Sequence, residues 1–216
     1  MNTKKKIALF TAAAAASAAL LIGGTYAYLT DYDAATNEFT VGKVDIELEE
    51  PTWDPKINTD IIPAQEINKD PQITNKGTNE AFVYLEVSVP MQKLITADEA
   101  GNRIDAALIE LFTFKADKSW TKMDSYVKGS NKVYLYSYNN ILKPSEKTTA
   151  LFKKMNFANV VEGQIDGKTF QVPVRAYAIQ TANTGGTGAT VPEQAKNAFN
   201  TYINQNKGGE GKVTTN

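Results

Sequence analysis

Apolar and acidic residues alternate strictly between positions 44 and 49. The apolar set is Val44, Ile46 and Leu48, and the positions between them are acidic. A period of two is typical of a strand with one face on a core and the other in water. We therefore expect a strand here, with Asp45 and Glu47 on its solvent side.

A second alternating stretch, residues 82–89, is apolar or aromatic at most positions of both sets. It predicts a strand that is partly covered on both faces and that ends at Pro90, because proline cannot donate to a sheet ladder. Further runs rich in β-branched and aromatic residues predict strands at 111–114, 133–138, 151–157 and 170–180.

Turn signals separate these runs, and Asp166-Gly167 predicts a tight hairpin because that pair supplies the positive φ values its turn requires. Helical periodicity is weak at 106–111 and clearer at 192–205. The second stretch has one apolar stripe, made by Ala195, Ala198, Phe199, Tyr202 and Ile203. The pattern predicts an all-β fold: an antiparallel, jelly-roll-like β-sandwich with one or two short helices.

The N-terminus has the pattern of a signal peptide. Three lysines at positions 4–6 precede an apolar run from Ile7 to Ile22, and a small-x-small triplet ends at Ala27. We expect cleavage between Ala27 and Tyr28. A retained anchor helix is the alternative, but the run of 16 residues is shorter than the ~20 that span a bilayer.

These signals divide the chain into four parts. We expect a signal peptide at 1–27, an N-terminal segment at 28–43, a β-sandwich domain at 44–182, and a Gly/Thr/Asn-rich linker, short amphipathic helix and flexible C-terminus at 183–216. Cleavage removes three lysines and no acids, which leaves 20 basic against 24 acidic residues. A mildly acidic surface without a basic stripe predicts no nucleic-acid partner, and membrane contact only through the signal peptide before cleavage.

The chain contains no histidine and no cysteine. Catalytic triads, thiolate nucleophiles and imidazole-based zinc sites are therefore excluded, whereas hydrolysis by a pair of carboxylates stays open. Asp31, Asp33 and the region of Asp60 offer oxygen ligands for calcium, but none lies in a spaced calcium-binding loop. We expect no catalytic residue, no metal and no cofactor. For an exported chain, the absence of cysteine fits a Gram-positive type of envelope.

Two stretches near the N-terminus resemble a known family. The runs 23–31 (GGTYAYLTD) and 37–46 (NEFTVGKVDI) resemble the N-termini of TasA and camelysin proteins, which carry a SipW-type signal peptide. Weaker likeness continues at 69–77 and 174–180, and the stretch 91–132 resembles nothing we can align.

The resemblance implies a secreted subunit of a surface fibre or biofilm matrix, processed by a SipW-type signal peptidase. It further implies polymerisation with copies of itself by donor-strand exchange, with accessory anchor or matrix proteins as further partners. The candidate donor strand is 28–35, which begins with Tyr28, Leu29, Thr30, Asp31 and Tyr32. An equally weighted reading makes this segment the first strand of its own sheet or an unattached leader.

The alternative function is a camelysin-like surface hydrolase or a carbohydrate-binding β-sandwich. Camelysin-like proteins carry a metalloendopeptidase label, which the missing histidines do not support. We therefore expect a structural protein and not an enzyme.

Overall fold

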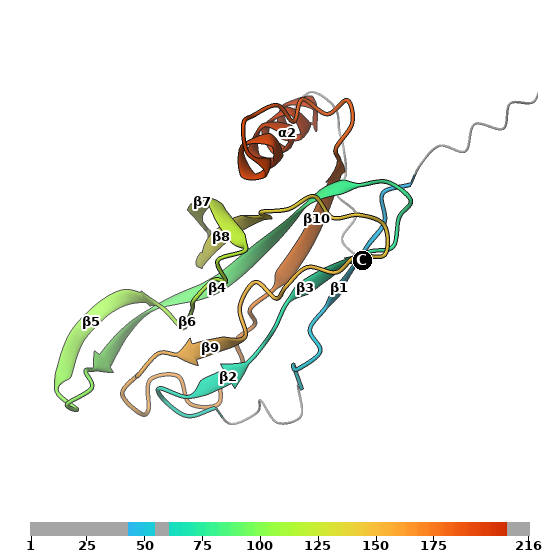
Figure 1. Ribbon diagram of the computed structural model, residues 1–216. Helices are drawn as coiled ribbons and strands as arrows, with labels where there is room; N and C mark the ends of the chain where they lie inside the picture. Colours follow the sequence, from blue (N-terminus) through green and yellow to red (C-terminus); the bar gives the residue numbers. More distant parts are fainter. Residues whose placement is uncertain (1–42, 55–60, 207–216) are drawn as a thin grey trace, which may run out of the picture. The chain divides into compact units, whose positions relative to one another are not determined.

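The computed structural model describes residues 43–54 and 61–206, which belong to one compact unit of the chain (Figure 1). The signal peptide, its cleavage site and the candidate donor strand lie outside the described residues. The domain boundaries expected from the sequence therefore remain a prediction.

The described chain forms antiparallel strands and one helix. In order these are β1 (Ile46–Glu49), β2 (Glu66–Asn68), β3 (Gln72–Asn75), β4 (Ala81–Ala97), β5 (Arg103–Glu110), β6 (Phe112–Phe114), β7 (Trp120–Lys128), β8 (Asn131–Tyr138), β9 (Lys154–Phe157), β10 (Val174–Gln180) and α2 (Val191–Asn206). The largest sheet has the order β10-β4-β8-β7, with β5 paired to the far end of β4. Two smaller sheets have the orders β1-β3 and β2-β9-β6.

β4 is the long strand that organises the large sheet (Figure 1). The prediction that its strand ends at Pro90 is wrong, because β4 continues through Pro90 to Ala97. Pro90 lies where β4 changes partner: before it the strand pairs with β8, and after it with β5. The missing amide is tolerated at this junction, and the Pro90 carbonyl accepts a 2.9 Å hydrogen bond from the Leu111 amide.

The main core lies between the large sheet and the two smaller ones. On β4, Val83, Leu85, Val87 and Val89 are all fully buried. They belong to one cluster with residues of the smaller sheets, among them Ile67, Ile73, Met155 and Phe157. Burial of this apolar surface stabilises the two-layer arrangement. The expected all-β antiparallel sandwich is confirmed.

The other face of the large sheet is covered by α2. Phe82 and Tyr84 of β4 share a second cluster with Ala195 and Ala198 of the helix. Phe199 contacts Tyr84 with ring centroids 5.0 Å apart. The expectation that β4 is covered on both faces is therefore confirmed, as is the helix predicted at 192–205.

Two local predictions are wrong. The stretch 106–111 is mostly strand β5 and not helix, because its backbone pairs with β4, and the first six residues of β5 are exposed. Asp166-Gly167 forms a turn, with the Lys168 amide bonded to the Ile165 carbonyl, but no hairpin. The residues before the turn pair with β4 and not with the residues after it, because Val161 and Gln164 hydrogen-bond to Ile95.

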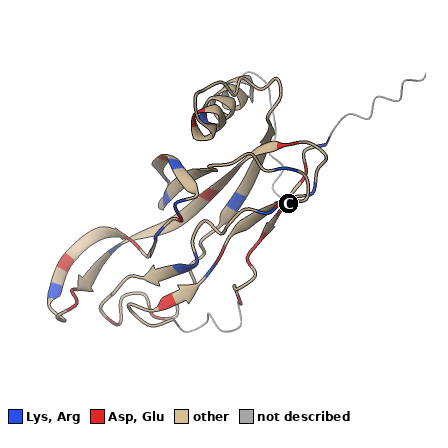
Figure 2. Ribbon diagram, viewed as in Figure 1, with Lys and Arg blue, Asp and Glu red and all other residues tan. Residues whose placement is uncertain are grey.

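Two predicted strands are shorter than expected: 151–157 pairs as β9 only from Lys154, and 170–180 pairs as β10 only from Val174. Basic and acidic residues are interspersed along the described strands (Figure 2). Within the described ranges no helix has the length and hydropathy of a membrane span.

Candidate functional site

An apolar groove opens at the edge of the sandwich between β2 and the segment that leads into β10. Its volume is about 350 Å³, at the lower end of the range for ligand clefts. Most of its lining is apolar and includes Trp53, Ile61, Ile67, Phe112, Met155 and Phe170. We call it the edge groove.

The floor of the edge groove belongs to the core. Ile67 of β2 is paired in register with Met155 of β9, and both are almost fully buried. Phe112 of β6 pairs with Phe157 of β9, two residues beyond Met155. Alternation along these short strands therefore places apolar side chains under the groove while the intervening residues, such as Glu66 and Lys154, point to solvent and pair with each other.

One wall is the β2 edge that faces away from β9. In its sheet, β2 is paired only with β9, and no described strand lies on its other side. The opposite wall is the segment 170–173, which belongs to no helix or strand. The backbone amides of Phe170, Gln171 and Val172 make no backbone hydrogen bond to any described residue. Both walls thus offer backbone groups to an added strand.

Among the described residues that line the groove, the one with a charged side chain is Lys69. Its Nζ atom lies 2.7 Å from Oε2 of Glu50 and 4.8 Å from the centre of the Trp53 ring. Only 9% of the Lys69 side chain is exposed. Because Glu50 satisfies the lysine charge, the groove favours apolar and aromatic side chains over a charged ligand.

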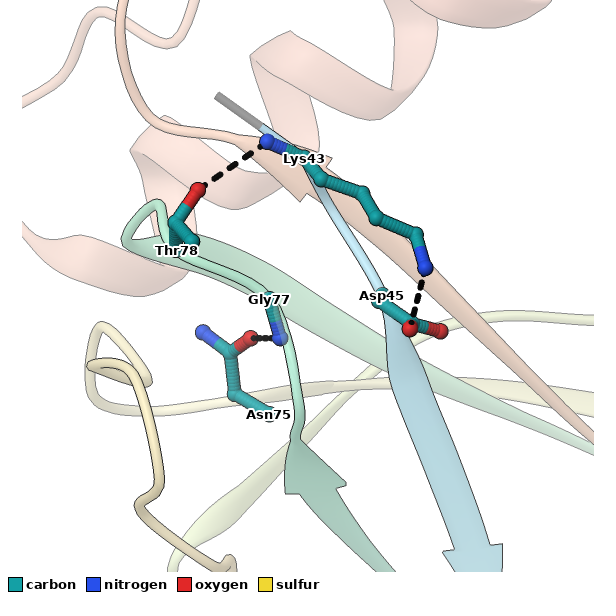
Figure 3. A network of polar contacts seen from close by, with 5 residues as sticks. All are labelled: Lys43, Asp45, Asn75, Gly77 and Thr78. Carbon is teal, nitrogen blue, oxygen red and sulfur yellow. Dashed lines mark hydrogen bonds and ion pairs between the residues drawn. The ribbon is translucent and has the colours of Figure 1, made fainter. Parts of the chain in front are cut away.

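A second feature lies where the N-terminal segment enters the domain. Residues 43–45 lie beside the turn 75–78 between β3 and β4 (Figure 3). Most of the contact is made by backbone groups. Lys76 and Gly77 donate their amides to the Asp45 carbonyl at 2.8 and 3.0 Å. We call residues 43–45 and 75–78 together the leader clamp.

Two reciprocal hydrogen bonds complete the leader clamp. Thr78 donates its amide to the Lys43 carbonyl at 3.0 Å, and Lys43 donates its amide to the Thr78 hydroxyl oxygen at 3.1 Å. Asn75, whose side chain is fully buried, accepts a 2.9 Å hydrogen bond from the Gly77 amide and so shapes the turn (Figure 3).

The acidic residues expected in water are placed there. Asp45 pairs with Lys43 and Glu47 with Lys76, and all four side chains are at least two-fifths exposed. The predicted site residues Ala27, Tyr28, Leu29, Thr30, Asp31 and Tyr32 lie outside the described residues, as do Asp33 and Asp60. The groove and the leader clamp were not predicted from the sequence.

Comparison with known families shows which family the chain resembles. The model of a family described as camelysin metallo-endopeptidase matches residues 2–136, more than half of the chain. The match covers the N-terminal segment and the strands to β8, and it ends before β9, β10 and the 170–173 wall of the edge groove. A search of curated proteins finds no match.

The family description implies a metal, and this chain lacks the side chains that build typical zinc sites. Protein zinc sites are built mainly from histidine and cysteine, with carboxylates as supplementary ligands. The chain has no histidine and no cysteine. Within residues 43–54 and 61–206, no three acidic side chains come together as a possible metal site.

Proposed function

Because this chain belongs to the camelysin metallo-endopeptidase family, we propose that it is a secreted structural subunit of a cell-surface fibre or matrix. Family membership supports a surface or extracellular location. In the proposed assembly, the N-terminal segment of one copy adds as a strand at the edge groove of the next. The observation that carries the proposal is this groove, on both walls of which backbone groups lack a strand partner or backbone hydrogen bond among the residues that the structure describes.

Two other edge strands, β5 and β7, are less suited to strand addition. β5 has one extra residue opposite β4 between the pairs formed by Leu94 and Thr96. β7 has one extra residue, Met123, opposite β8. Such bulges twist an edge strand and interrupt its ladder, and proteins use them to prevent unwanted pairing. The β2 edge has no bulge in its pairing with β9.

The chemistry of segment 28–35 matches the groove. Tyr28, Thr30 and Tyr32 share one face of an extended chain, so two aromatic rings point the same way. Tyrosine buries a large apolar area and keeps a polar tip at the rim. A groove lined by Trp53, Phe112 and Phe170 suits such anchors.

The position of the leader clamp supports a head-to-tail arrangement. The N-terminal segment enters at Lys43, before β1, whereas Trp53 and the groove follow β1 in the chain. A segment must therefore turn back to reach its own groove, but can extend from its root to reach a neighbour. A contact between two different surfaces of the same protein propagates into a filament unless its rotation closes a ring.

The test compares the chain from Tyr28 onward, the expected exported form, with a deletion of 28–35 and with Val172→Asp. Val172 lines the groove and is half-buried, so a carboxylate there opposes entry of an apolar strand. Negative-stain microscopy and sedimentation should show filaments for the parent chain and none for either variant. Val127→Asp is the matched control, because Val127 is 58% exposed on β7.

Mixing the two variants sharpens the test. The deletion variant keeps an open groove without a donor, and Val172→Asp keeps a donor without a usable groove. Each should stay monomeric alone, and an equimolar mixture should form dimers in light scattering after gel filtration. Filaments from the deletion variant that match those of the parent chain would show that 28–35 is only a leader.

A further inference from the structure

We propose that the leader clamp is the joint that anchors the N-terminal segment to its own domain, and that Gly77 is its positioning residue. The inference rests on the proposed function: the peptide chain already joins a donated strand to its own domain, and the clamp would restrict the movement of that strand relative to the domain. Four hydrogen bonds between residues 43–45 and 76–78 provide that restraint.

Glycine is required at position 77 by close approach and not by conformation. A Cβ atom at Gly77 would lie 2.3 Å from the Lys43 carbonyl oxygen and 2.8 Å from the Asp45 amide nitrogen. Both neighbours are backbone atoms, so the 43–45 segment has to move away. Gly101 is the opposite case, since its φ is +84° and nothing lies within 4 Å of a Cβ there.

The clamp bonds lie directly before the β1–β3 ladder. Ile46 pairs with Asn75, so the clamp extends the pairing of β1 and β3 by three residues towards the N-terminus. Without the clamp, tension on the N-terminal segment would act on Ile46 and open a strand of only four residues from its end. With the clamp, the same tension is shared with the turn that begins β4, the central strand.

The chain itself supplies a probe of the clamp. After the expected cleavage at Ala27, Lys43 is the first basic residue, so trypsin acting there releases a single peptide, 28–43. The Lys43 side chain is 71% exposed, but its carbonyl and amide are held by Thr78. Protease cleavage of such a site requires local opening, and its rate follows the population of the open form.

Mass spectrometry would measure the release rate of peptide 28–43 from the chain beginning at Tyr28. Gly77→Ala should accelerate release by at least about tenfold, as expected for a loss of several backbone hydrogen bonds. Thr78→Val should do so more weakly, because it removes only the oxygen that accepts from the Lys43 amide. Gly101→Ala strains a distant turn and should leave the rate unchanged.

Thermal unfolding of each variant separates clamp opening from general destabilisation. The inference predicts faster release in Gly77→Ala and Thr78→Val at temperatures where circular dichroism reports a folded sheet. Equal release rates in the parent chain and both clamp variants would overturn it, as would equal acceleration by Gly101→Ala. Because the readout is proteolysis, a parent chain that forms no filaments would contradict the proposed function and still leave the clamp measurable.

Discussion

Asn75 offers a direct test of how the turn after β3 is stabilised. Its side chain is fully buried and makes three hydrogen bonds of 2.9 Å. The amide group donates to the carbonyls of Asn79 and Leu142, and the side-chain oxygen accepts from the Gly77 amide. One residue thus joins the leader clamp, the start of β4 and the loop before β9.

Asn75→Ala removes all three hydrogen bonds, each of which contributes about 1 kcal/mol to stability. Two of the former partners keep another bond, because the Leu142 carbonyl still accepts from Ala81 and the Gly77 amide still donates to Asp45. The full desolvation penalty therefore falls only on the Asn79 carbonyl. We expect the free energy of unfolding to fall by about 2 to 3 kcal/mol.

Asn75→Asp keeps the shape and changes one donor group into an oxygen. At pH 7 that oxygen faces the carbonyls of Asn79 and Leu142 with a buried charge, which should cost more than the alanine variant, on the order of several kcal/mol. Burial and the two carbonyls raise the pKa of the new carboxyl. The variant should therefore recover stability relative to the parent as the pH falls through that raised pKa, because the protonated acid donates to one carbonyl.

Urea unfolding followed by tryptophan fluorescence, at pH 7.5 and at pH 4.5, measures both effects. At pH 7.5 the parent should be the most stable, the alanine variant less stable and the aspartate variant the least stable. If both variants stay within about 0.5 kcal/mol of the parent, a range typical of surface substitutions, the reasoning about this buried amide is refuted. If the difference in free energy of unfolding between the aspartate variant and the parent is no smaller at pH 4.5 than at pH 7.5, a buried charge is not the cause of the lower stability.

Two further predictions concern alkaline stability and catalysis. Burial raises the pKa of Tyr84 well above its ordinary value of 10.0, so its stabilising contribution is complete below pH 10 and is lost as the pH rises further. Tyr84→Phe loses the 2.7 Å hydrogen bond to the Ala195 carbonyl and should be less stable than the parent at pH 8. In urea unfolding, the difference in free energy of unfolding between parent and variant should shrink between pH 8 and pH 11. A difference that stays constant over this range would contradict the prediction. Because the chain lacks histidine and cysteine, we expect the purified protein to show no zinc-dependent hydrolysis of casein. Hydrolysis that is abolished by EDTA and restored by zinc would argue for the peptidase function.

The local pattern of apolar and polar residues was sufficient to predict features that depend on residues close together in the chain. The alternation at 44–48 predicted which side of β1 faces the core, and Val44, Ile46 and Leu48 do pack against it. The stripe at 195–203 predicted α2, whose first turn is closed by reciprocal hydrogen bonds between Thr190 and Glu193. Composition alone excludes imidazole and thiolate chemistry, because the chain has no histidine and no cysteine.

Pairing between strands that are distant in the sequence determined the features that the local pattern did not predict. The stretch 106–111 has a helical pattern, but β4 provides a ladder for it, and tertiary pairing outweighs a weak local preference. Pro90 reads as a strand end, yet it is accommodated because β4 changes partners at that residue. The edge groove brings β2 next to segment 170–173, about 100 residues later in the chain, and Gly77 meets Lys43, 34 residues earlier, so no local pattern of the sequence specifies either contact.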